Sequence, residues 1–440
     1  MGNKEIDEFS KTSKAKKKRI LVGTSLFYPL QGGGEDVLLN WLIDFHHRGH
    51  KVTVITPTKE RMGYERIFPF EVIRLRQDKE EKVVQNANSF SSLVIESSLS
   101  EDDLSRNLMQ KGLDVLKTRE NYDYYIGYGN WGATREDENI CSFATLLKKE
   151  YKDIITMRIL WDAQGFEYKS ETDLVLNATP YNLIKNYNNP VVEEEKVVLI
   201  PKPKNNSIKN FSYQEWLNRP FDFVFNNPHL NKGGLVVLNL AKHYPNKEFL
   251  VKVGHWGQDE YLDGITILSK MKKLSNVTTL KMVDNGKNDD GMATNFYRKG
   301  KYLLYPSILE GFGLMPMEAA IQGTIPLVSQ TNVLMYSSSP FSEFIFSEEI
   351  GYDPLLNFKN YKEIDYDSIS TKWIEKIKFL DNHEQLVKSL HSNLRFTESF
   401  LLQRYEDSVN NFFNFLEKEN FNNKEGDFIA CNGGLVYKTK

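Results

Sequence analysis

The stretch YPSILEGFGLMPMEAAIQG occupies residues 305–323 and carries the clearest local signals in the chain. An apolar run that ends at Tyr305 predicts a strand. Residues 306–313 contain a proline and two glycines, which predicts a loop whose backbone can approach a ligand closely. Residues 314–322 predict a helix, with Gly323 just beyond its end. The expected order is therefore strand, glycine-containing loop and helix.

This order places a helix N-terminus at the carboxyl end of a parallel strand. The unpaired amides and the macrodipole of such a terminus favour an anion, for example a diphosphate. Glu310 on the loop and Glu318 on the helix flank this predicted site, and carboxylates accept hydrogen bonds from sugar and ribose hydroxyls. The alternative is a structural role, as a loop carboxylate and a first-turn glutamate. We favour the ligand site, because the two glutamates can then grip two parts of one donor.

Strand and helix signals alternate along both halves of the chain, which is typical of parallel α/β sheets. Strands of the first half are predicted at residues 19–24, 51–56, 71–75, 124–128, 154–160 and 173–176. Strands of the second half are predicted at residues 221–225, 249–253, 277–282 and 302–305. The first two strands enclose a glycine triplet at 32–34 and a helical pattern, which makes a βαβ unit. Doubly wound α/β architecture is therefore expected in each half.

A chain of 440 residues is too long for one core, since single cores stop growing at roughly 250 to 300 residues. A polar stretch with two prolines after residue 200 is a candidate linker. We predict a polar basic leader (1–18), a first α/β domain (19–200), a linker (201–219), a second α/β domain (220–396), a long amphipathic helix (397–420) and a tail (421–440).

Composition indicates a soluble globular protein, because apolar residues make up 40%, charged residues 26%, and the net charge is only -3. This balance gives no reason to expect binding to nucleic acid. No signal peptide and no apolar run of about 20 residues is present, so we expect a cytoplasmic protein. The basic run at residues 14–19 has two interpretations, a solvated tail or a peripheral contact with anionic lipid at the inner face of the membrane.

Neither a disulfide framework nor a metal site is expected. Cys141 and Cys431 are the two cysteines, and they lie far apart without neighbours at metal-ligand spacing. Asp365 and Asp367 have the spacing of an Asp-x-Asp metal motif, but a solvated turn is the simpler interpretation of that polar stretch.

The pair Glu310 and Glu318, embedded in Pro-Ser-x-x-Glu-Gly-Phe-Gly-Leu, resembles the signature of glycosyltransferase family four. Residues 27–29, 32–34, 48–54 and 226–234 resemble other loops and strands of that family, so the likeness extends from Arg19 to about Leu416. It implies a GT-B fold, with two Rossmann-like domains facing across a cleft and a C-terminal helix returning to the first domain.

The same resemblance implies a retaining, metal-independent hexosyltransferase of polysaccharide biosynthesis that uses no cofactor. The donor would be a nucleotide-diphosphate sugar, and the acceptor a glycan, a glycoprotein or a lipid-linked molecule. Glu318 would hold the ribose, Glu310 would lie beside the sugar, and Lys232 would stabilise the leaving group. The implied donor-binding residues are Gly33, Gly34, Asn227, His229, Lys232, Glu310, Gly311, Phe312, Gly313, Leu314 and Glu318.

Two features depart from the family pattern. Members often carry an arginine shortly before the lysine of the second-domain loop, where this chain has Asn226, Asn227 and His229. They also tend to have a first-domain histidine near the sugar, but this chain has no histidine between residues 51 and 228. Asp162, beside Trp161, is our candidate for that position, and the loop at residues 130–132 is the alternative. The predicted catalytic residues are thus Glu310, Lys232 and Asp162.

Two further interpretations of the whole chain stay open. A GT-B-like partner subunit or chaperone without catalysis would explain the missing arginine and histidine. A nucleotide-sugar epimerase would share the fold and the donor. The intact glutamates favour the transferase.

Overall fold

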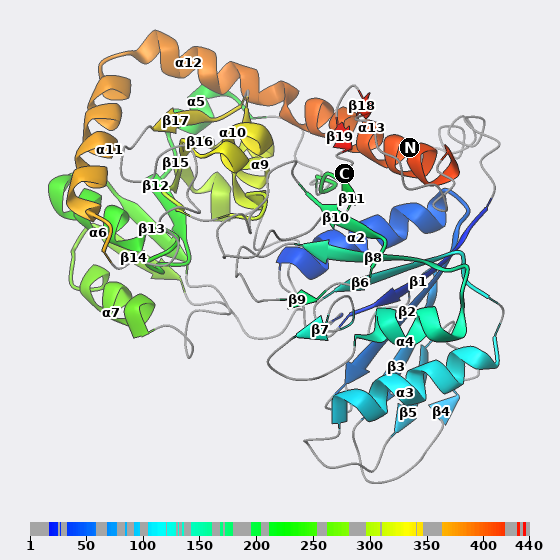
Figure 1. Cartoon of the computed structure of the whole chain (residues 1–440). Helices are drawn as coiled ribbons and strands as arrows, with labels where there is room; N and C mark the ends of the chain where they lie inside the picture. The colour runs from blue at the N-terminus through cyan, green and yellow to red at the C-terminus, as the bar shows by residue number, and fades with distance from the viewer. Residues whose placement is uncertain are drawn as a thin grey trace.

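Two sheets form the framework of the chain in the computed structural model (Figure 1). The structure describes residues 17–24, 27, 33–58, 68–76, 84–85, 92–96, 104–119, 121–128, 131, 134–135, 142–160, 168–169, 172–178, 195–203, 211–252, 262–280, 296–308, 310–339, 341–345, 363–418, 429–431 and 434–436. Both sheets carry helices, so the expected α/β class is confirmed.

The first sheet has nine strands in the order β11-β10-β8-β6-β1-β2-β3-β5-β4. Its strands are β1 (Arg19–Gly23), β2 (Lys51–Thr58), β3 (Glu71–Arg76), β4 (Val84–Gln85), β5 (Ser92–Glu96), β6 (Tyr124–Tyr128), β8 (Ile155–Leu160), β10 (Leu174–Asn177) and β11 (Glu195–Val198). All neighbours pair in parallel except β4 with β5. The helices of this half are α2 (Gly33–His47), α3 (Leu104–Lys117) and α4 (Phe143–Glu150).

The second sheet has six strands, all parallel, in the order β14-β13-β12-β15-β16-β17. Its strands are β12 (Phe221–Asn226), β13 (Phe249–Lys252), β14 (Val277–Leu280), β15 (Gly300–Tyr305), β16 (Ile325–Ser329) and β17 (Glu343–Ile345). Its helices are α5 (Tyr213–Leu217), α6 (Gly234–His243), α7 (Leu262–Met271), α9 (Leu314–Ile321), α10 (Asn332–Ser338), α11 (Tyr366–Asp381) and α12 (Glu384–Asn393).

The strands predicted from apolar runs are confirmed, and their burial explains why those runs were visible. Every residue of β16 is buried, as are Tyr302 to Tyr305 in β15. Strands covered on both faces read as continuous apolar runs rather than as alternating patterns. Helix α9 begins and ends where the sequence predicts, because Gly313 precedes it and Gly323, with a φ of 73°, follows it.

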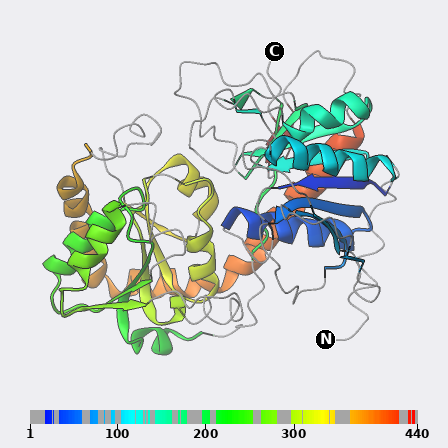
Figure 2. The same ribbon diagram turned by 90° about the horizontal axis from the view of Figure 1, so that it is seen from below.

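A long helix, α13 (Thr397–Lys418), follows the 3-10 turn at Leu394–Phe396 and returns the chain to the first domain (Figure 2). Its Phe412 ring stacks on Phe45 of α2 with 5.8 Å between ring centroids. Arg48, just after α2, forms an ion pair with Glu406 and donates a 3.0 Å hydrogen bond to Asn410. The predicted return of the C-terminal helix is therefore confirmed. None of the described helices is long and apolar enough to cross a membrane.

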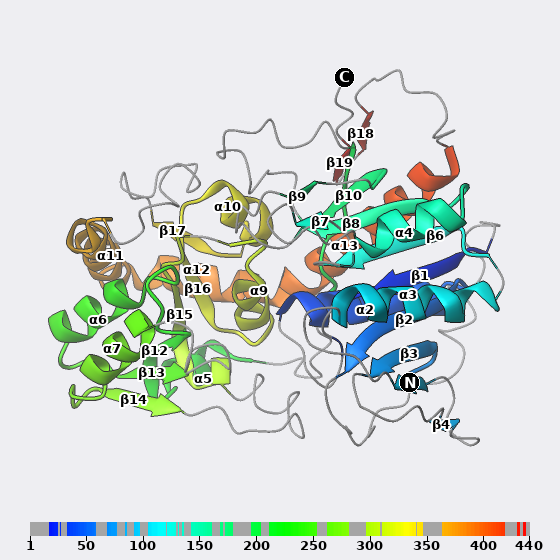
Figure 3. The same cartoon turned by 60° about the horizontal axis from the view of Figure 1, so that its bottom comes forward.

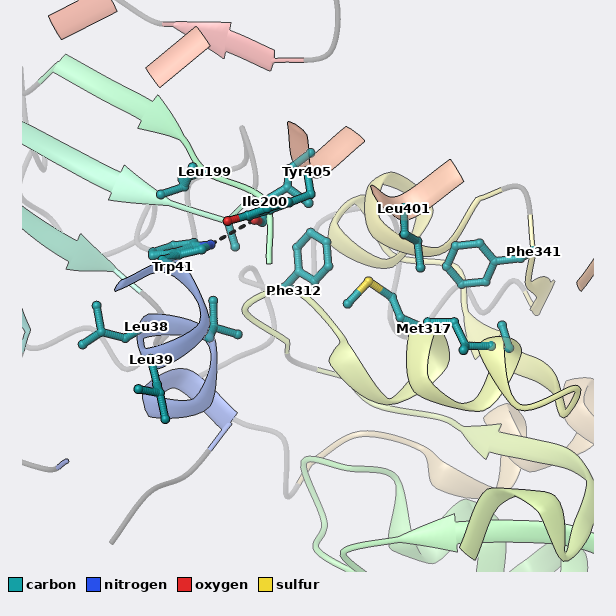
Figure 4. Close-up of a cluster of buried hydrophobic side chains, with 14 of the residues drawn as sticks. Leu38, Leu39, Trp41, Leu199, Ile200, Phe312, Met317, Phe341, Leu401 and Tyr405 are labelled. Atoms are coloured by element: carbon teal, nitrogen blue, oxygen red, sulfur yellow. Dashed lines mark hydrogen bonds between the residues drawn. The ribbon is translucent and has the colours of Figure 1, made fainter. Parts of the chain in front are cut away.

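Apolar side chains form a continuous core where the two domains meet (Figure 4). Trp41 of α2 is fully buried, and its indole donates a 3.1 Å hydrogen bond to the carbonyl oxygen of Ile200. On the other side lie Met317 of α9 and Leu401 of α13, with Phe312 between the two groups. Because Phe312 is 4% exposed, the loop before α9 is packed into this core at its tip.

Three small features lie outside the two main sheets: one short helix and two pairs of short strands. Helix α5 begins within residues 201–219, with Ser212 and Glu215 forming a capping box. Strands β18 (Ile429–Cys431) and β19 (Gly434–Val436) pair antiparallel within residues 421–440. Strands β7 (Thr134–Arg135) and β9 (Tyr168–Lys169) form a second small pair.

Candidate functional site

Two helices of the second domain begin side by side at the carboxyl ends of adjacent strands. β12 leads to α6 and β15 leads to α9, and the two strands pair directly. Each helix is preceded by a glycine with left-handed backbone, Gly233 at φ 75° and Gly313 at φ 87°, and neither has a side-chain cap. The first-turn amides of both helices can therefore bind an anion.

The two loops are fastened to each other by backbone contacts. The Ile308 amide donates a 2.9 Å hydrogen bond to the carbonyl oxygen of Asn231. A Cβ atom added at Gly233 would collide with the Pro306 carbonyl oxygen, so only glycine permits this approach. The beginning of α6 and the beginning of α9 thus form one structural unit.

Lys232 and Glu310 meet across this junction. The Lys232 Nζ lies 2.6 Å from Glu310 Oε1, and the Ser307 hydroxyl donates to the same oxygen at 2.6 Å. The side chains of Lys232 and Glu310 are 25% and 11% exposed, so the pair is largely removed from water but still accessible. The structure therefore brings together two of the three residues that we predict to be catalytic.

Two buried tyrosines lie beneath the glutamates. Tyr297 donates a 3.1 Å hydrogen bond to Glu318 Oε2, and Tyr305 lies near Glu310. Burial, and then the nearby glutamates, raise the pKa of both phenols well above the usual range. Glu310 lies in the loop that leads into α9, and Glu318 lies within α9. The two carboxylates therefore belong to a single site.

The loop from β12 to α6 supplies further polar groups. Asn227 has a φ of 62°, the one positive φ outside glycine in the described residues. The side-chain nitrogen Nδ2 of Asn226 lies 3.1 Å from the sulfur of Met315 in the first turn of α9. Burial, and then Lys232, lower the pKa of His229, so its imidazole is neutral at physiological pH. Its ring packs against Gly264 of α7.

The loop from β15 to α9 also contacts the first domain through Phe312, as described above. Helix α2 begins at Gly33, and Gly34 is half-buried in its first turn. α2 and α9 approach each other where the domains meet (Figure 3). Gly33 and Gly34 consequently lie on an element that borders the contact between the two domains.

Several predictions fall outside the described residues, including Trp161, Asp162, Asn130 and Gly132. Trp131 is described, and it is 3% exposed, with its carbonyl accepting a 2.6 Å hydrogen bond from Tyr125. Its side chain is therefore part of the first-domain core. Residues 14–16 of the basic run at 14–19 are likewise outside the described part of the chain.

No group of three or more His, Cys, Asp or Glu side chains in the described residues is arranged to hold a metal ion. Asp365 instead caps α11, accepting hydrogen bonds from the amides of Asp367 and Ser368 at 3.1 Å each. This capping turn accounts for the Asp-x-Asp spacing.

The sequence analysis did not identify Ser307, Tyr297 and Tyr305 as residues that lie beside the two glutamates. Ser307 follows Pro306 within the quoted stretch, so its proximity in sequence to Glu310 was a usable signal. Tyr297 gave no such signal, because 21 residues separate it from Glu318 and only folding brings them together.

No family model and no curated protein matches the sequence. Solved structures do match its fold. A sucrose-phosphate synthase from Thermosynechococcus elongatus is 12% identical, with a TM-score of 0.61 over 91% of this chain and 99% of that one. A glycosyltransferase from Rickettsia africae is 11% identical, with a TM-score of 0.58 over 92% and 100%. A pneumococcal O-GlcNAc transferase, solved with UDP and GlcNAc, is 12% identical, with a TM-score of 0.55 over 92% and 100%. The chain therefore has the GT-B fold.

Proposed function

We propose that the chain is a retaining glycosyltransferase, of the kind found in family four, that moves a sugar from a nucleotide-diphosphate sugar to a glycan, glycoprotein or lipid-linked acceptor. The observation that carries this proposal is the junction of α6 and α9. There, two uncapped helix N-termini, the Lys232–Glu310 pair and Glu318 surround one site. The structural likeness to a transferase solved with UDP supports it.

In this proposal the diphosphate lies against the first-turn amides of α6 and α9. Lys232 balances the negative charge that grows on the leaving diphosphate as the glycosidic bond breaks. Glu318 accepts hydrogen bonds from the ribose hydroxyls, and Glu310 accepts one from a hydroxyl of the sugar. The acceptor hydroxyl attacks from the same face that the diphosphate leaves, so the anomeric configuration is retained. The first domain binds the acceptor, and Gly33 and Gly34 at the beginning of α2 let this domain approach the donor.

Two experiments test the proposal. UDP, GDP and ADP are each added to the chain, and the one that binds is expected to raise the melting temperature by mass action. The corresponding nucleotide sugars are then screened for sugar transfer and for hydrolysis. Glu318→Ala is expected to weaken nucleotide binding about tenfold or more, as loss of hydrogen bonds to a charged group predicts. Glu375→Ala, on an exposed part of α11, is the matched control.

The alternatives give different results. A partner subunit or chaperone without catalysis would show no nucleotide-dependent rise in the melting temperature. An epimerase would convert the donor to a different sugar nucleotide without any acceptor. Unchanged binding and transfer after Glu318→Ala would exclude the proposed role of this site.

A further inference from the structure

The core beneath the two glutamates contains the tyrosines Tyr297 and Tyr305. Each is 3% exposed, and both belong to one apolar cluster with Ala319, Val328 and Leu334. A hydroxyl in such surroundings costs free energy unless it finds a partner. For Tyr297 the partner is the carboxylate of Glu318, at 3.1 Å. The cluster therefore directs the Tyr297 phenol toward one of the two acidic residues of the site, and the Tyr305 phenol lies near the other, Glu310.

The protonation state of the Tyr297 phenol fixes the direction of its hydrogen bond. Because burial raises the pKa of Tyr297 well above the usual range, the phenol keeps its proton at physiological pH and donates it to the Glu318 carboxylate. Tyr297 is itself buried, so this bond holds the carboxylate from the protein interior. Hydrogen bonds to an ionised acceptor are about twice as strong as neutral ones.

We propose that Tyr297 is a positioning residue of the donor site that orients Glu318 for the nucleotide. This inference rests on the proposed function. Tyr305 provides a contrast, because Glu310 beside it is held by Lys232 and Ser307 at 2.6 Å each. Loss of the Tyr297 hydroxyl therefore weakens nucleotide binding, whereas loss of the Tyr305 hydroxyl leaves nucleotide binding nearly unchanged.

Tyr297→Phe and Tyr305→Phe test this inference, with Tyr302→Phe as the matched control. Tyr302 lies on β15 with Tyr305 but on the opposite face, where it packs against Trp216 and Phe223. UDP, GDP and ADP are titrated by calorimetry, and kcat and KM are measured with the matching nucleotide sugar. We expect Tyr297→Phe to raise the Kd of the nucleoside diphosphate about tenfold, as loss of one hydrogen bond to a charged group predicts. We expect Tyr305→Phe to leave this Kd within about twofold.

A double-mutant cycle separates positioning from a general structural role. If Tyr297 acts through Glu318, adding Tyr297→Phe to Glu318→Ala should weaken nucleotide binding no further. Additive losses would overturn the inference, as would a Tyr297→Phe chain that binds nucleotide like Tyr302→Phe. Ligand-free melting temperatures show which variants are folded, and if Tyr297→Phe melts early, the titrations are made at a temperature below its transition. Wild-type chain that binds none of the three nucleotides would instead refute the proposed function.

Discussion

At the scale of single residues, ion pairs and hydrogen bonds hold the charged side chains of the site in place. Lys232 is the cation placed between the two helix N-termini, and Glu310 holds it at 2.6 Å. The pair is partly buried, so its interaction is less screened than that of an exposed ion pair.

We expect Lys232→Met to lower kcat about 100-fold, because removing one group that stabilises transition-state charge typically has this effect. Lys301→Met is the matched control, since Lys301 forms a 3.0 Å ion pair with Asp222 and is 24% exposed, close to the 25% of Lys232. Steady-state kinetics with the accepted nucleotide sugar provides the measurement. Equal losses in both variants would show that Lys232 acts only through stability.

The sequence pointed to those residues of the candidate site that lie together in one short stretch. Glu310 and Glu318 were recognisable because the surrounding glycines and the helix signals lie in the same nineteen-residue segment, at 305–323. The tyrosine that hydrogen-bonds Glu318 was not recognisable, because Tyr297 lies in a preceding segment and reaches Glu318 only through tertiary packing. Local patterns do not specify such contacts.

At the scale of elements, glycine geometry sets how closely the two helix starts approach. Gly233 has a φ of 75° and faces the Pro306 carbonyl oxygen without a Cβ. The element boundaries around it were predictable, since strand, glycine and helix signals are all local. Helix α5 was not expected within the polar stretch, although Ser212 and Glu215 have the Ser-x-x-Glu spacing of a capping box.

Gly233→Ala is expected to destabilise the chain by roughly 2 to 4 kcal/mol, from backbone strain and from separation of the two loops. The loops carry the site, so nucleotide affinity should fall with it. Urea unfolding and calorimetry measure the two effects. A variant with wild-type stability and affinity would show that the contact of Gly233 with Pro306 does not matter.

Two buried histidines, His50 and His391, make the stability of the folded chain depend on pH. Burial, before any nearby charge, lowers the pKa of His50 and of His391 to about 4 from the ordinary 6.5. His50 stacks on Phe413, and His391 of α12 lies in a cage with Trp216 of α5. The unfolded chain binds these protons more readily, so stability is present above pH 6.5 and is lost as the pH falls toward 4.

Each histidine should contribute at most about 1.4 kcal/mol of lost stability per pH unit within that window. His391→Phe keeps an aromatic ring in the cage and removes one of the two protons, so the decline between pH 6.5 and 4.5 should become shallower. The free energy of unfolding in urea, measured across this range, tests the expectation.

At the scale of the whole molecule, the two domains share one core. Trp41, Phe312 and Leu401 come from three distant parts of the chain and meet in it (Figure 4). Helix α13 extends this core along the first domain, where Phe412 is 1% exposed. We therefore expect the wild-type chain to unfold in a single thermal transition.

Phe412→Ala should loosen α13 from α2 and separate this transition into two, with the first domain melting at the lower temperature. Removal of a buried phenylalanine typically costs about 3 to 5 kcal/mol. Leu380→Ala in α11, where Leu380 is 3% exposed within the second domain, should instead lower the melting of that domain. Differential scanning calorimetry distinguishes the two patterns. Identical profiles for the two variants would contradict the assignment.

The return of α13 has a consequence for synthesis on the ribosome. The apolar face of α2, with Trp41 and Phe45, emerges early, but the helix that covers Phe45 is translated only after the entire second domain. At a typical rate of about 5 to 20 residues per second, that face stays uncovered for tens of seconds. A nascent chain halted before residue 397 would expose this apolar surface, so newly made protein should depend on chaperones until α13 is released.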